Sequence, residues 1–520
     1  MQKVLTLGAA LLLAGAAPAE TASAARRRND IEMSSKEMKG SKAMKMKRRH
    51  FLGLAAGAAA FGIGGPAFGQ SRARQIAAGR KIRVALIGCG GRLRSVLVTK
   101  CLDEEIVAMV DPDAPQMTYT KERLAKLAPS YDLSKVKTFA DYRVFLEQMG
   151  DAVDAAIIAS NQQSHAPIAI ACMKKGIHVY VEKPICYSEE EADLLAAAQR
   201  KYGVVTQAGH HGHSGPFQPL VAEYVQSGAL GQVREVWSWS DRFNAQRALS
   251  PVIAPPKGMD WDLWVGPAEM RPYRRSYLGQ RWYDIRGFGN GSLGNMGNHV
   301  LDAPFWALNL MGTPPTSVTM EDMSYVCPES WPTRETITYE FPARPGMDPV
   351  TLHWMDGIKD DVPIDEDVQY HYAKREWMNF PPIVLELEKK FKMNLGNIGT
   401  LFMGEKGILW AGQFGNAYQF VPMSLKKTLP APPKKFRRLA KGKSHVHEFF
   451  DAIREGRKAN ADFVDYGVPL VKTVLLGNVV ALAARDGRPR VEWDGKAVTN
   501  NPAANAYCRT TYRKGWEIEI

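Results

Sequence analysis

Between residues 81 and 208, the chain alternates short apolar runs with helical segments. Apolar runs at 82–88, 105–111, 154–160, 178–181 and 204–209 predict buried β-strands. Helices are expected at 92–101, 116–127, 165–176 and 189–203, and Ser188-Glu189-Glu190-Glu191 predicts a capping box at the start of the last one. Strands and helices that alternate over short connections predict an α/β fold with a doubly wound parallel sheet.

The pattern after residue 208 is less regular. Residues 231–241, 317–326 and 335–343 predict further strands, and 447–456 and 467–484 predict helices that close the fold. Residues 360–395 are charged and rich in Met and Tyr and give no assignment, whereas Pro430–Lys435 predicts a linker or an exposed loop. Beyond residue 70 we find no run of 18 apolar residues, so we expect no membrane association of the mature chain.

Residues 1–69 predict export signals. Met1–Ala19 is typical of a secretory signal. A second signal begins at Lys47–Leu52 (KRRHFL), where paired arginines precede a Gly/Ala-rich run, as in twin-arginine export. We therefore expect the twin-arginine machinery to deliver the protein to the periplasm or beyond, with 70–80 as a linker. A basic amphipathic tail is the alternative. Translation from Met33, Met38, Met44 or Met46 would make the first signal a wrongly assigned start.

Composition narrows the class of partner. The 520 residues are 45% hydrophobic and 23% charged, which is ordinary for a globular protein of two or more domains. Residues 1–69 hold 11 of the 67 Lys and Arg but only 4 of the 54 Asp and Glu. More than half of the net charge of +13 therefore belongs to the export region, and we expect no nucleic-acid partner. Six scattered cysteines without a CxxC pair predict neither a disulfide framework nor a metal site.

A glycine-rich turn, Gly88-Cys89-Gly90-Gly91-Arg92-Leu93, follows the first predicted strand. Gly88 permits a tight turn, and Gly90 lets a pyrophosphate approach the backbone at a helix N-terminus. Leu93 stands where the GxGxxG pattern has a small residue, which weakens the motif. Asp111 ends the second strand 21 residues after Gly90, where an acid binds a ribose 2′-hydroxyl. These features predict a Rossmann dinucleotide site. Asp111 favours NAD because it would repel a 2′-phosphate, and NADP stays open.

The motifs after the later strands resemble those of a known family. Glu182-Lys183-Pro184 follows the strand at 178–181, and SNQQSH (160–165) follows the strand before it. With these motifs the chain resembles the Gfo/Idh/MocA family of glucose–fructose oxidoreductase and inositol dehydrogenase. The resemblance implies that Lys183 lies beside the nicotinamide and the substrate hydroxyl. It also implies that Ser160, Asn161, His165 and Glu182 border the cofactor.

Motifs that resemble the exported bacterial branch of this family continue toward the C-terminus. They are GHHGHS (209–214), DWDLWVGP (260–267), RPY (271–273), GSLGNMGNH (291–299), LLGN (475–478), WD (493–494) and NAY (505–507). The resemblance implies a dinucleotide-binding domain at 81–208 and a second α/β domain at 209–520 with an open, mostly antiparallel sheet. The second domain would bind substrate, and its free sheet face would pair copies into a homodimer or homotetramer.

The resemblance also implies a catalytic Asp-x-x-x-His signature at 295–299. His299 is present, but Asn295 stands in the place of the aspartate. A histidine is suited to accept a hydroxyl proton near pH 7 as hydride leaves the same carbon. Asn295 supplies no charge to stabilise the resulting imidazolium. We therefore expect His299 to be a weaker base here, or the chemistry to differ.

Histidine and aromatic residues supply the expected substrate contacts. His210, His211 and His213 have a spacing that suggests a metal, but no carboxylate or Cys stands nearby in the sequence, and we predict none. The resemblance implies instead that His213 lies near the substrate. Aromatic residues gather between 261 and 306, where rings can stack on the C–H faces of sugars, although about half are expected to be ordinary core. The predicted substrate-binding residues are His213, Trp261, Tyr273, Trp282 and Asp284.

These features together predict an NAD-dependent oxidoreductase that acts on a CH–OH group of a sugar or glycoside. Free NAD is scarce outside the cytoplasm, so the cofactor is expected to be bound tightly before export and recycled in place. A redox-neutral NAD-dependent glycoside hydrolase stays open, although the Tyr-Pro-Thr-His motif of such relatives is not visible. A sugar-binding protein without turnover is the third hypothesis, favoured by Leu93 and Asn295 and opposed by Lys183 and His299.

Overall fold

The computed structural model describes residues 73–244, 249–279, 281–324, 327–360, 362 and 373–520. All of these residues belong to one compact unit, Ala67–Ile520. Both predicted export signals lie outside the described residues.

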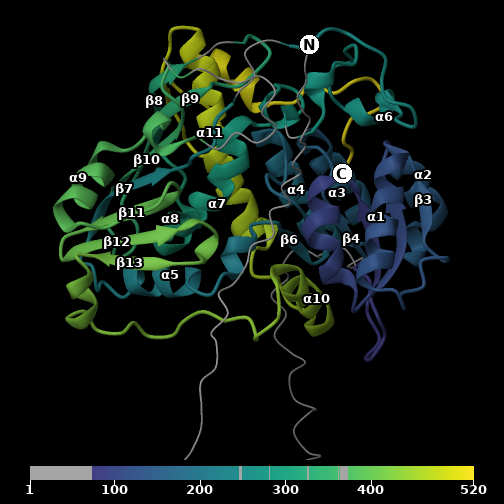
Figure 1. Ribbon diagram of the computed structural model, residues 1–520, viewed down its shortest axis with the longest axis horizontal. Coiled ribbons are helices and arrows are strands. Elements are labelled where there is room, and N and C mark those ends of the chain that lie inside the picture. Colours follow the sequence, from purple (N-terminus) through teal and green to yellow (C-terminus); the bar gives the residue numbers. More distant parts are fainter. Residues whose placement is uncertain (1–72, 245–248, 280, 325–326, 361, 363–372) are drawn as a thin grey trace, which may run out of the picture. The chain divides into compact units, whose positions relative to one another are not determined.

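The first sheet contains six strands in the order β3-β2-β1-β4-β5-β6, and every neighbouring pair is parallel. The predicted apolar runs form β1 (Arg83–Ile87), β2 (Glu105–Val110), β4 (Ala155–Ile158), β5 (His178–Val181) and β6 (Thr206–Ala208). β3 (Lys137–Phe139) and α2 (Tyr142–Met149) lie between β2 and β4 and were not predicted. This doubly wound sheet, drawn in purple and blue in Figure 1, is the expected Rossmann fold.

Helices connect the strands of the first sheet: α1 (Ala114–Leu127), α3 (His165–Lys174) and α4 (Glu189–Tyr202). The segment after the glycine turn differs from the expected regular helix, because Leu93–Leu97 is a π-helix and Val98–Cys101 a 3₁₀ turn. The capping box of α4 is only half formed. Ser188 Oγ accepts the Glu191 amide at 3.3 Å, and the strongest backbone contact of the Glu191 carboxylate is the amide of Tyr187 at 2.7 Å.

The second sheet contains eight strands in the order β13-β12-β11-β7-β10-β9-β8-β14. All neighbours are antiparallel except β7 and β10, so the sheet is mostly antiparallel, as expected. The strands are β7 (Val233–Trp239), β8 (Ser317–Ser324), β9 (Arg334–Phe341), β10 (Val350–Gly357), β11 (Gly399–Gly404), β12 (Gly407–Gly412), β13 (Tyr418–Val421) and β14 (Arg490–Glu492).

Both faces of the second sheet are at least partly covered, because side chains alternate along each strand. Val236 of β7 packs into the main core, to which α5 (Gln218–Gln226), α8 (Asp302–Ala307) and α11 (Val468–Arg485) contribute. Trp239, on the opposite face of the same strand, packs with Val384 and Leu387 of α9 (Pro382–Phe391). Residues 360–395, which gave no assignment from sequence, thus include a helix that covers this sheet.

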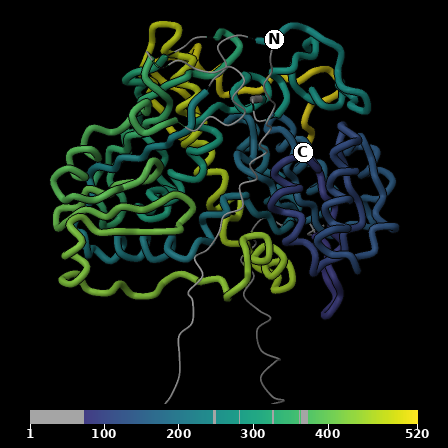
Figure 2. The backbone as a smooth tube through the Cα atoms, viewed as in Figure 1, coloured from purple at the N-terminus to yellow at the C-terminus, as the bar shows by residue number. Residues whose placement is uncertain are grey.

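One helix from late in the chain completes the first domain. α10 (His445–Glu455) places Val446, Phe449 and Phe450 in the same core cluster as Val84 and Leu86 of β1. Figures 1 and 2 show this yellow-green segment beside the blue strands. The predicted second domain at 209–520 therefore lends a helix to the first sheet.

α11 was predicted as a helix that closes the fold. Among the described residues, Phe463–Arg485 is the helical segment long and apolar enough on average to cross a membrane, although Asp465, Lys472 and Asn478 interrupt it, so it is not an unbroken apolar run of 18 residues. However, 78% of its most apolar window is buried inside the protein. This burial is what a core helix of a folded domain requires.

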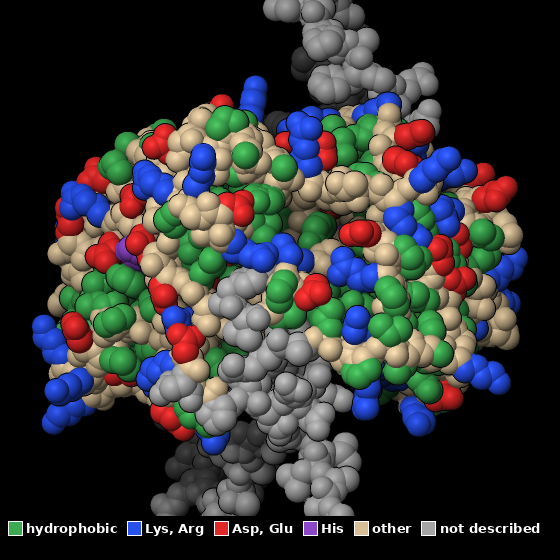
Figure 3. Space-filling model, turned by 90° about the horizontal axis from the view of Figure 1, so that it is seen from above, with side chains coloured by type: hydrophobic (Ala, Val, Ile, Leu, Met, Phe, Trp, Pro, Cys, Tyr) green, Lys and Arg blue, Asp and Glu red, His purple; other side chains and the backbone are tan. Residues whose placement is uncertain are grey.

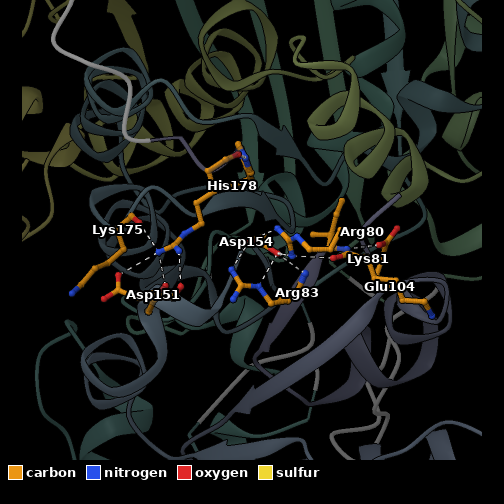
Figure 4. Close-up of polar contacts among 11 residues, drawn as sticks. Arg80, Lys81, Arg83, Glu104, Asp151, Asp154, Lys175 and His178 are labelled. Carbon is orange, nitrogen blue, oxygen red and sulfur yellow. Dashed lines mark hydrogen bonds and ion pairs between the residues drawn. The ribbon is translucent and has the colours of Figure 1, made fainter. Parts of the chain in front are cut away.

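A polar network closes the amino-terminal edge of the first sheet (Figure 4). Arg74 donates to the carbonyl oxygens of Gly150 and Lys175, and Asp154 accepts from Arg80 and Arg83 at 2.7 and 2.8 Å. Burial alone would raise the pKa of Asp154, but the hydrogen bonds from the two arginines outweigh it and lower the pKa. The network holds the segment that leads into β1 at the amino-terminal ends of the strands. Ligands of such sheets bind at the opposite, carboxyl-terminal ends.

Candidate active site

A cavity of about 750 Å³ opens at the carboxyl ends of the parallel strands. β1, β2, β4 and β5 each end just before a lining residue: Gly88, Asp111, Ser160 and Glu182. Its other walls come from the second domain and include His211, Arg242, Trp282, Asn295, His299 and Phe414. The cavity therefore lies where an open parallel sheet usually binds its ligand, and both domains contribute to it.

The glycine turn gives one end of the cavity its shape. Gly88 has φ +80°, and a Cβ there would lie 2.4 Å from the Ser160 amide nitrogen, so only glycine fits. Gly90 and Gly91 border the cavity, and a Cβ at Gly91 would meet no protein atom within 4 Å. An added side chain would instead occupy the space that a ligand needs.

Two residues of the predicted motif do not line the cavity. The Cys89 and Leu93 side chains are fully buried in the core cluster of the first domain. Cys89 contributes through its backbone, because its amide donates to Asp111 Oδ2 at 2.7 Å. Leu93 is the first residue of the π-helix that stands in place of the regular α-helix expected after the glycine turn.

Asp111 lines the cavity and also holds the glycine turn. Its carboxylate accepts the Cys89 amide and, at 2.8 Å, the Asp113 amide. Burial raises the pKa of Asp111 to about 7, although these two hydrogen bonds act in the opposite direction. Each oxygen keeps a second lone pair, so the carboxylate can still accept from a ribose hydroxyl. The open glycine cradle and this acid together fit a dinucleotide.

The loop after β4 connects the two domains. Ser160, Asn161 and His165 all line the cavity. The Asn161 amide donates to the carbonyl oxygen of Trp264 at 3.1 Å, and the ring nitrogens of His165 face the carbonyl oxygens of Pro184 and Ser160. These contacts fix the loop in place beside Lys183.

Lys183 and Asn295 form the contact at the inner end of the cavity. Lys183 Nζ donates to the backbone oxygen of Asn295 at 2.7 Å and to its Oδ1 at 2.5 Å. Burial lowers the pKa of Lys183 to about 7, although Glu182 acts in the opposite direction. Asn295 was expected to be the partner of His299. Instead, its amide oxygen is used by Lys183.

His299, in the short helix α7 (Asn298–Val300), faces the same cavity. Its Nδ1 is buried and has no hydrogen-bond partner among the described residues. Burial holds the pKa of His299 well below its ordinary value, and Lys183 and His211 lower it further. The imidazole is therefore neutral at physiological pH.

Arg92 links the glycine turn to the inner end of the cavity. Its Nε donates to Glu182 Oε1 at 2.9 Å, and its Nη2 lies 3.1 Å from His211 Nδ1. The His211 ring packs edge-to-face on His299 with ring centroids 4.8 Å apart. Sequence reasoning did not select His211. The only signal for it was the cluster of three histidines, from which His213 was chosen.

Most of the residues predicted to contact substrate do not line this cavity. Of the five predicted residues, Trp282 lines the cavity. His213 is 4% exposed, pairs with Asp302 at 2.9 Å and stacks on Trp306, so it is a core residue. Trp261 and Tyr273 pack against each other, and Trp261 donates to the Arg271 carbonyl oxygen away from the cavity. Asp284 is buried outside the cavity wall.

Phe414 was also missed, and it comes from a distant part of the chain. It lies in the turn between β12 and β13, lines the cavity and packs against both His211 and His299 with centroids 4.6 Å apart. Its φ of +59° is uncommon for a residue with a side chain. Gly212 and Gly215 lie so close to its backbone that a Cβ on either would clash.

No group of three or more His, Cys, Asp or Glu side chains arranged to hold a metal occurs in the described part of the chain. The six cysteines are all buried free thiols.

Comparisons with known proteins match both domains. A model of an oxidoreductase family with an NAD-binding Rossmann fold (Gfo/Idh/MocA) matches residues 82–210, and a model of that family's C-terminal α/β domain matches residues 224–343. The first domain is therefore an NAD-binding domain.

Individual relatives match only in part. A glycosyl hydrolase family 109 protein of Stenotrophomonas maltophilia is 35% identical over 26% of this chain and 29% of its own length. A 1,5-anhydro-D-fructose reductase of Ensifer adhaerens is 27% identical over 31% and 41%. The chain thus spans less than half the length of these curated relatives.

Solved structures show the same fold. The WlbA dehydrogenase of Bordetella pertussis, solved with NADH and UDP-GlcNAcA, matches with a TM-score of 0.50 at 16% identity. The match covers 80% of this chain and 99% of WlbA.

Proposed function

Because the chain belongs to the Gfo/Idh/MocA oxidoreductase family, we propose that it is an NAD-dependent oxidoreductase acting on a CH–OH carbon of a sugar or glycoside. The observation that carries this proposal is the position of Lys183 and His299. They come from two different domains and line one cavity with the glycine turn and Asp111. A dinucleotide bound with its pyrophosphate at the glycine turn would place its nicotinamide end beside these two side chains.

The side chains divide the proton chemistry between them. NAD, when bound, supplies the acceptor or donor of the hydride. Burial lowers the pKa of Lys183 to about 7, so the neutral amine is present near neutral pH and can accept the hydroxyl proton. His299 is the weaker base, because its pKa is held well below the ordinary value. We therefore assign proton acceptance to Lys183 and substrate positioning to His299, which reverses the roles expected from sequence.

The setting of the reaction is part of the same proposal. The twin-arginine pattern at Lys47–Leu52 supports export of a folded protein, to the periplasm or beyond. A protein exported with its dinucleotide would recycle it in place, by oxidising one sugar and reducing another. We further propose that NAD is preferred over NADP, since Asp111 would repel a 2′-phosphate, and that copies pair as a homodimer or homotetramer.

A second function is favoured by one specific finding. Two family 109 glycosyl hydrolases are among the relatives that match part of this chain. The same Lys183 and His299 would serve a redox-neutral cleavage in which transient oxidation acidifies a neighbouring C–H, elimination breaks the glycosidic bond and hydride returns. We rank it second because the Tyr-Pro-Thr-His motif expected of such enzymes is not visible in the sequence.

One experiment separates these functions. Purified protein that retains its cofactor is mixed with one aldose or one methyl glycoside at a time, so that no second sugar can reoxidise or reduce the cofactor, while absorbance near 340 nm is recorded. A lasting change with formation of a ketone or lactone supports the oxidoreductase. Release of the aglycone without net change supports the hydrolase. Binding without either signal leaves a sugar-binding protein and contradicts both enzyme proposals.

A further inference from the structure

We propose that His211 is a substrate-contact residue whose Nε2–H donates a hydrogen bond to the sugar oxygen on the reacting carbon. The proposal deepens the function proposed above and rests on it. His211 lines the cavity together with Lys183 and His299, and it belongs to none of the residues expected from sequence to contact substrate.

The first step is the position of the proton on the ring. Arg92 Nη2 lies 3.1 Å from His211 Nδ1. A guanidinium group can only donate hydrogen bonds, so Nδ1 must be the acceptor. Arg92 is itself fixed by its ion pair with Glu182 at 2.9 Å. The neutral ring therefore carries its proton on Nε2, which makes no hydrogen bond to any residue that the structure describes.

The second step is the fixed orientation of the ring. His299 packs against one part of it at 4.8 Å, and Phe414 against another at 4.6 Å. Phe414 holds this place with a left-handed backbone, a conformation that is unfavourable for a residue with a side chain and that persists only where the surrounding structure enforces it. The close approach of Gly212 and Gly215 to Phe414 fixes that turn against the segment that carries His211. The orientation of the His211 Nε2–H is thus fixed before any ligand enters the cavity.

The third step is what a fixed donor does in this reaction. During reduction, hydride reaches the carbonyl carbon and negative charge develops on the oxygen, which then takes a proton from Lys183. During oxidation, the hydroxyl would lose its proton to Lys183 while the carbon that bears it gives up a hydride to the bound NAD, and the new carbonyl oxygen would accept a hydrogen bond from His211. His211 gains and loses no proton in either direction. Its role is the stabilisation of charge on oxygen, as in an oxyanion hole.

The surroundings of His211 keep this donor in place over a wide pH range. Burial and the neighbouring Arg92 lower the pKa of His211 to about 4. Glu182 acts in the opposite direction, but it is already paired with Arg92. The donor therefore persists at every pH at which Lys183 titrates, and His211 contributes no inflection to the pH profile.

The test compares His211→Phe, which keeps a ring but removes the donor, with His211→Gln, which keeps an N–H. We expect His211→Phe to lower kcat/KM by about 10²–10³-fold, the usual effect of one such donor. His211→Gln should recover at least tenfold of that loss. The pH midpoint of kcat/KM and the affinity for NADH, measured by fluorescence, should stay as in the wild type. A loss under threefold, a moved pH midpoint or a parallel loss of NADH affinity overturns the proposal.

A second measurement does not depend on turnover. In protein labelled with ¹⁵N-histidine, the ring nitrogen shifts of His211, identified by their loss in His211→Gln, should report a neutral Nε2–H tautomer. An Nδ1–H tautomer overturns the proposal even in an active enzyme. If the wild type oxidises or reduces none of the sugars, the proposed function fails. The role of His211 is then judged by whether methyl glycosides shift its Nε2–H resonance.

Discussion

Asn295 accepts two hydrogen bonds from Lys183, and its side chain places no negative charge beside the lysine. A carboxylate at this position would hold the lysine as an ammonium group. The neutral amide leaves burial as the main influence, and the pKa of Lys183 falls to about 7. The family resemblance alone identified the substitution, but it connected Asn295 to His299 because the two residues are four positions apart.

Replacing Asn295 with Asp tests this assignment. In the wild type, kcat/KM for sugar oxidation should rise with pH through a midpoint near 7, because only the neutral amine of Lys183 accepts a proton. Asn295→Asp places a negative charge against Lys183 Nζ and should raise that midpoint by about one pH unit or more. Asn394→Asp makes the same change at an exposed site and should leave the profile unchanged. A midpoint well below 6.5 that Asn295→Asp does not move would make His299 the base instead.

Asp111 allows a prediction about cofactor choice. Its carboxylate accepts the amides of Cys89 and Asp113, so Asp111→Ser removes both a ribose contact and a support of the glycine turn. We expect NADH affinity to fall by about 10- to 100-fold, the effect of losing a hydrogen bond to a charged group. NADPH should lose less, because the repulsion of its 2′-phosphate also disappears. Fluorescence titration measures both, with the exposed Asp132→Ser as control. Tighter binding of NADPH than NADH by the wild type would contradict this interpretation.

At the scale of elements, the sequence predicts those strands and helices whose residue pattern is enough to identify them without their tertiary partners. The strands of the first sheet are continuous apolar runs because both faces are buried. β3 escapes prediction because it has three residues, two of them exposed, and is a strand only through its pairing with β2. β11 and β12 are short runs between glycines, and their structure depends on pairing at the far side of the second sheet.

The residues of the candidate site also divide into those that the local sequence pattern predicts and those that only tertiary packing places there. Gly88, Asp111, Ser160 and Lys183 are predictable because each follows a parallel strand, and such strands end at one edge. Phe414 reaches the cavity through a left-handed turn that no local propensity indicates. His211 and His213 are two positions apart in a 3₁₀ turn, and only tertiary packing decides that the first faces the cavity and the second the core.

The packing of α10 gives a prediction at this scale. Phe449 is fully buried and lies edge-to-face on Tyr180 of β5, with centroids 6.1 Å apart. Phe449→Ala should lower the free energy of unfolding by about 3–5 kcal/mol, the cost of a large cavity in a core. Leu385→Ala, at a site 48% exposed, should change it by less than about 0.5 kcal/mol. Urea denaturation measures both. A small effect of Phe449→Ala would mean that α10 is not part of the first domain's core.

At the scale of the whole chain, the cavity joins residues from position 88 to position 414, so neither domain has a complete site alone. On the face seen in Figure 3, Lys and Arg side chains are interspersed with Asp and Glu side chains. A folded, two-domain site that encloses a dinucleotide is also the kind of cargo that a pathway for folded proteins would carry.

The last prediction concerns export with the cofactor in place. Replacing Arg48 and Arg49 together with lysine keeps the charge but removes the guanidinium pair that the twin-arginine machinery reads, so the precursor should remain in the cytoplasm. Lys47→Ala removes a neighbouring charge and should leave export intact. Cell fractionation measures the location, and absorbance at 340 nm after reduction measures bound NAD in each fraction. Equal export of the doubly substituted precursor contradicts the twin-arginine assignment. Exported protein without NAD contradicts recycling in place, because a cofactor lost after export finds little free NAD to replace it.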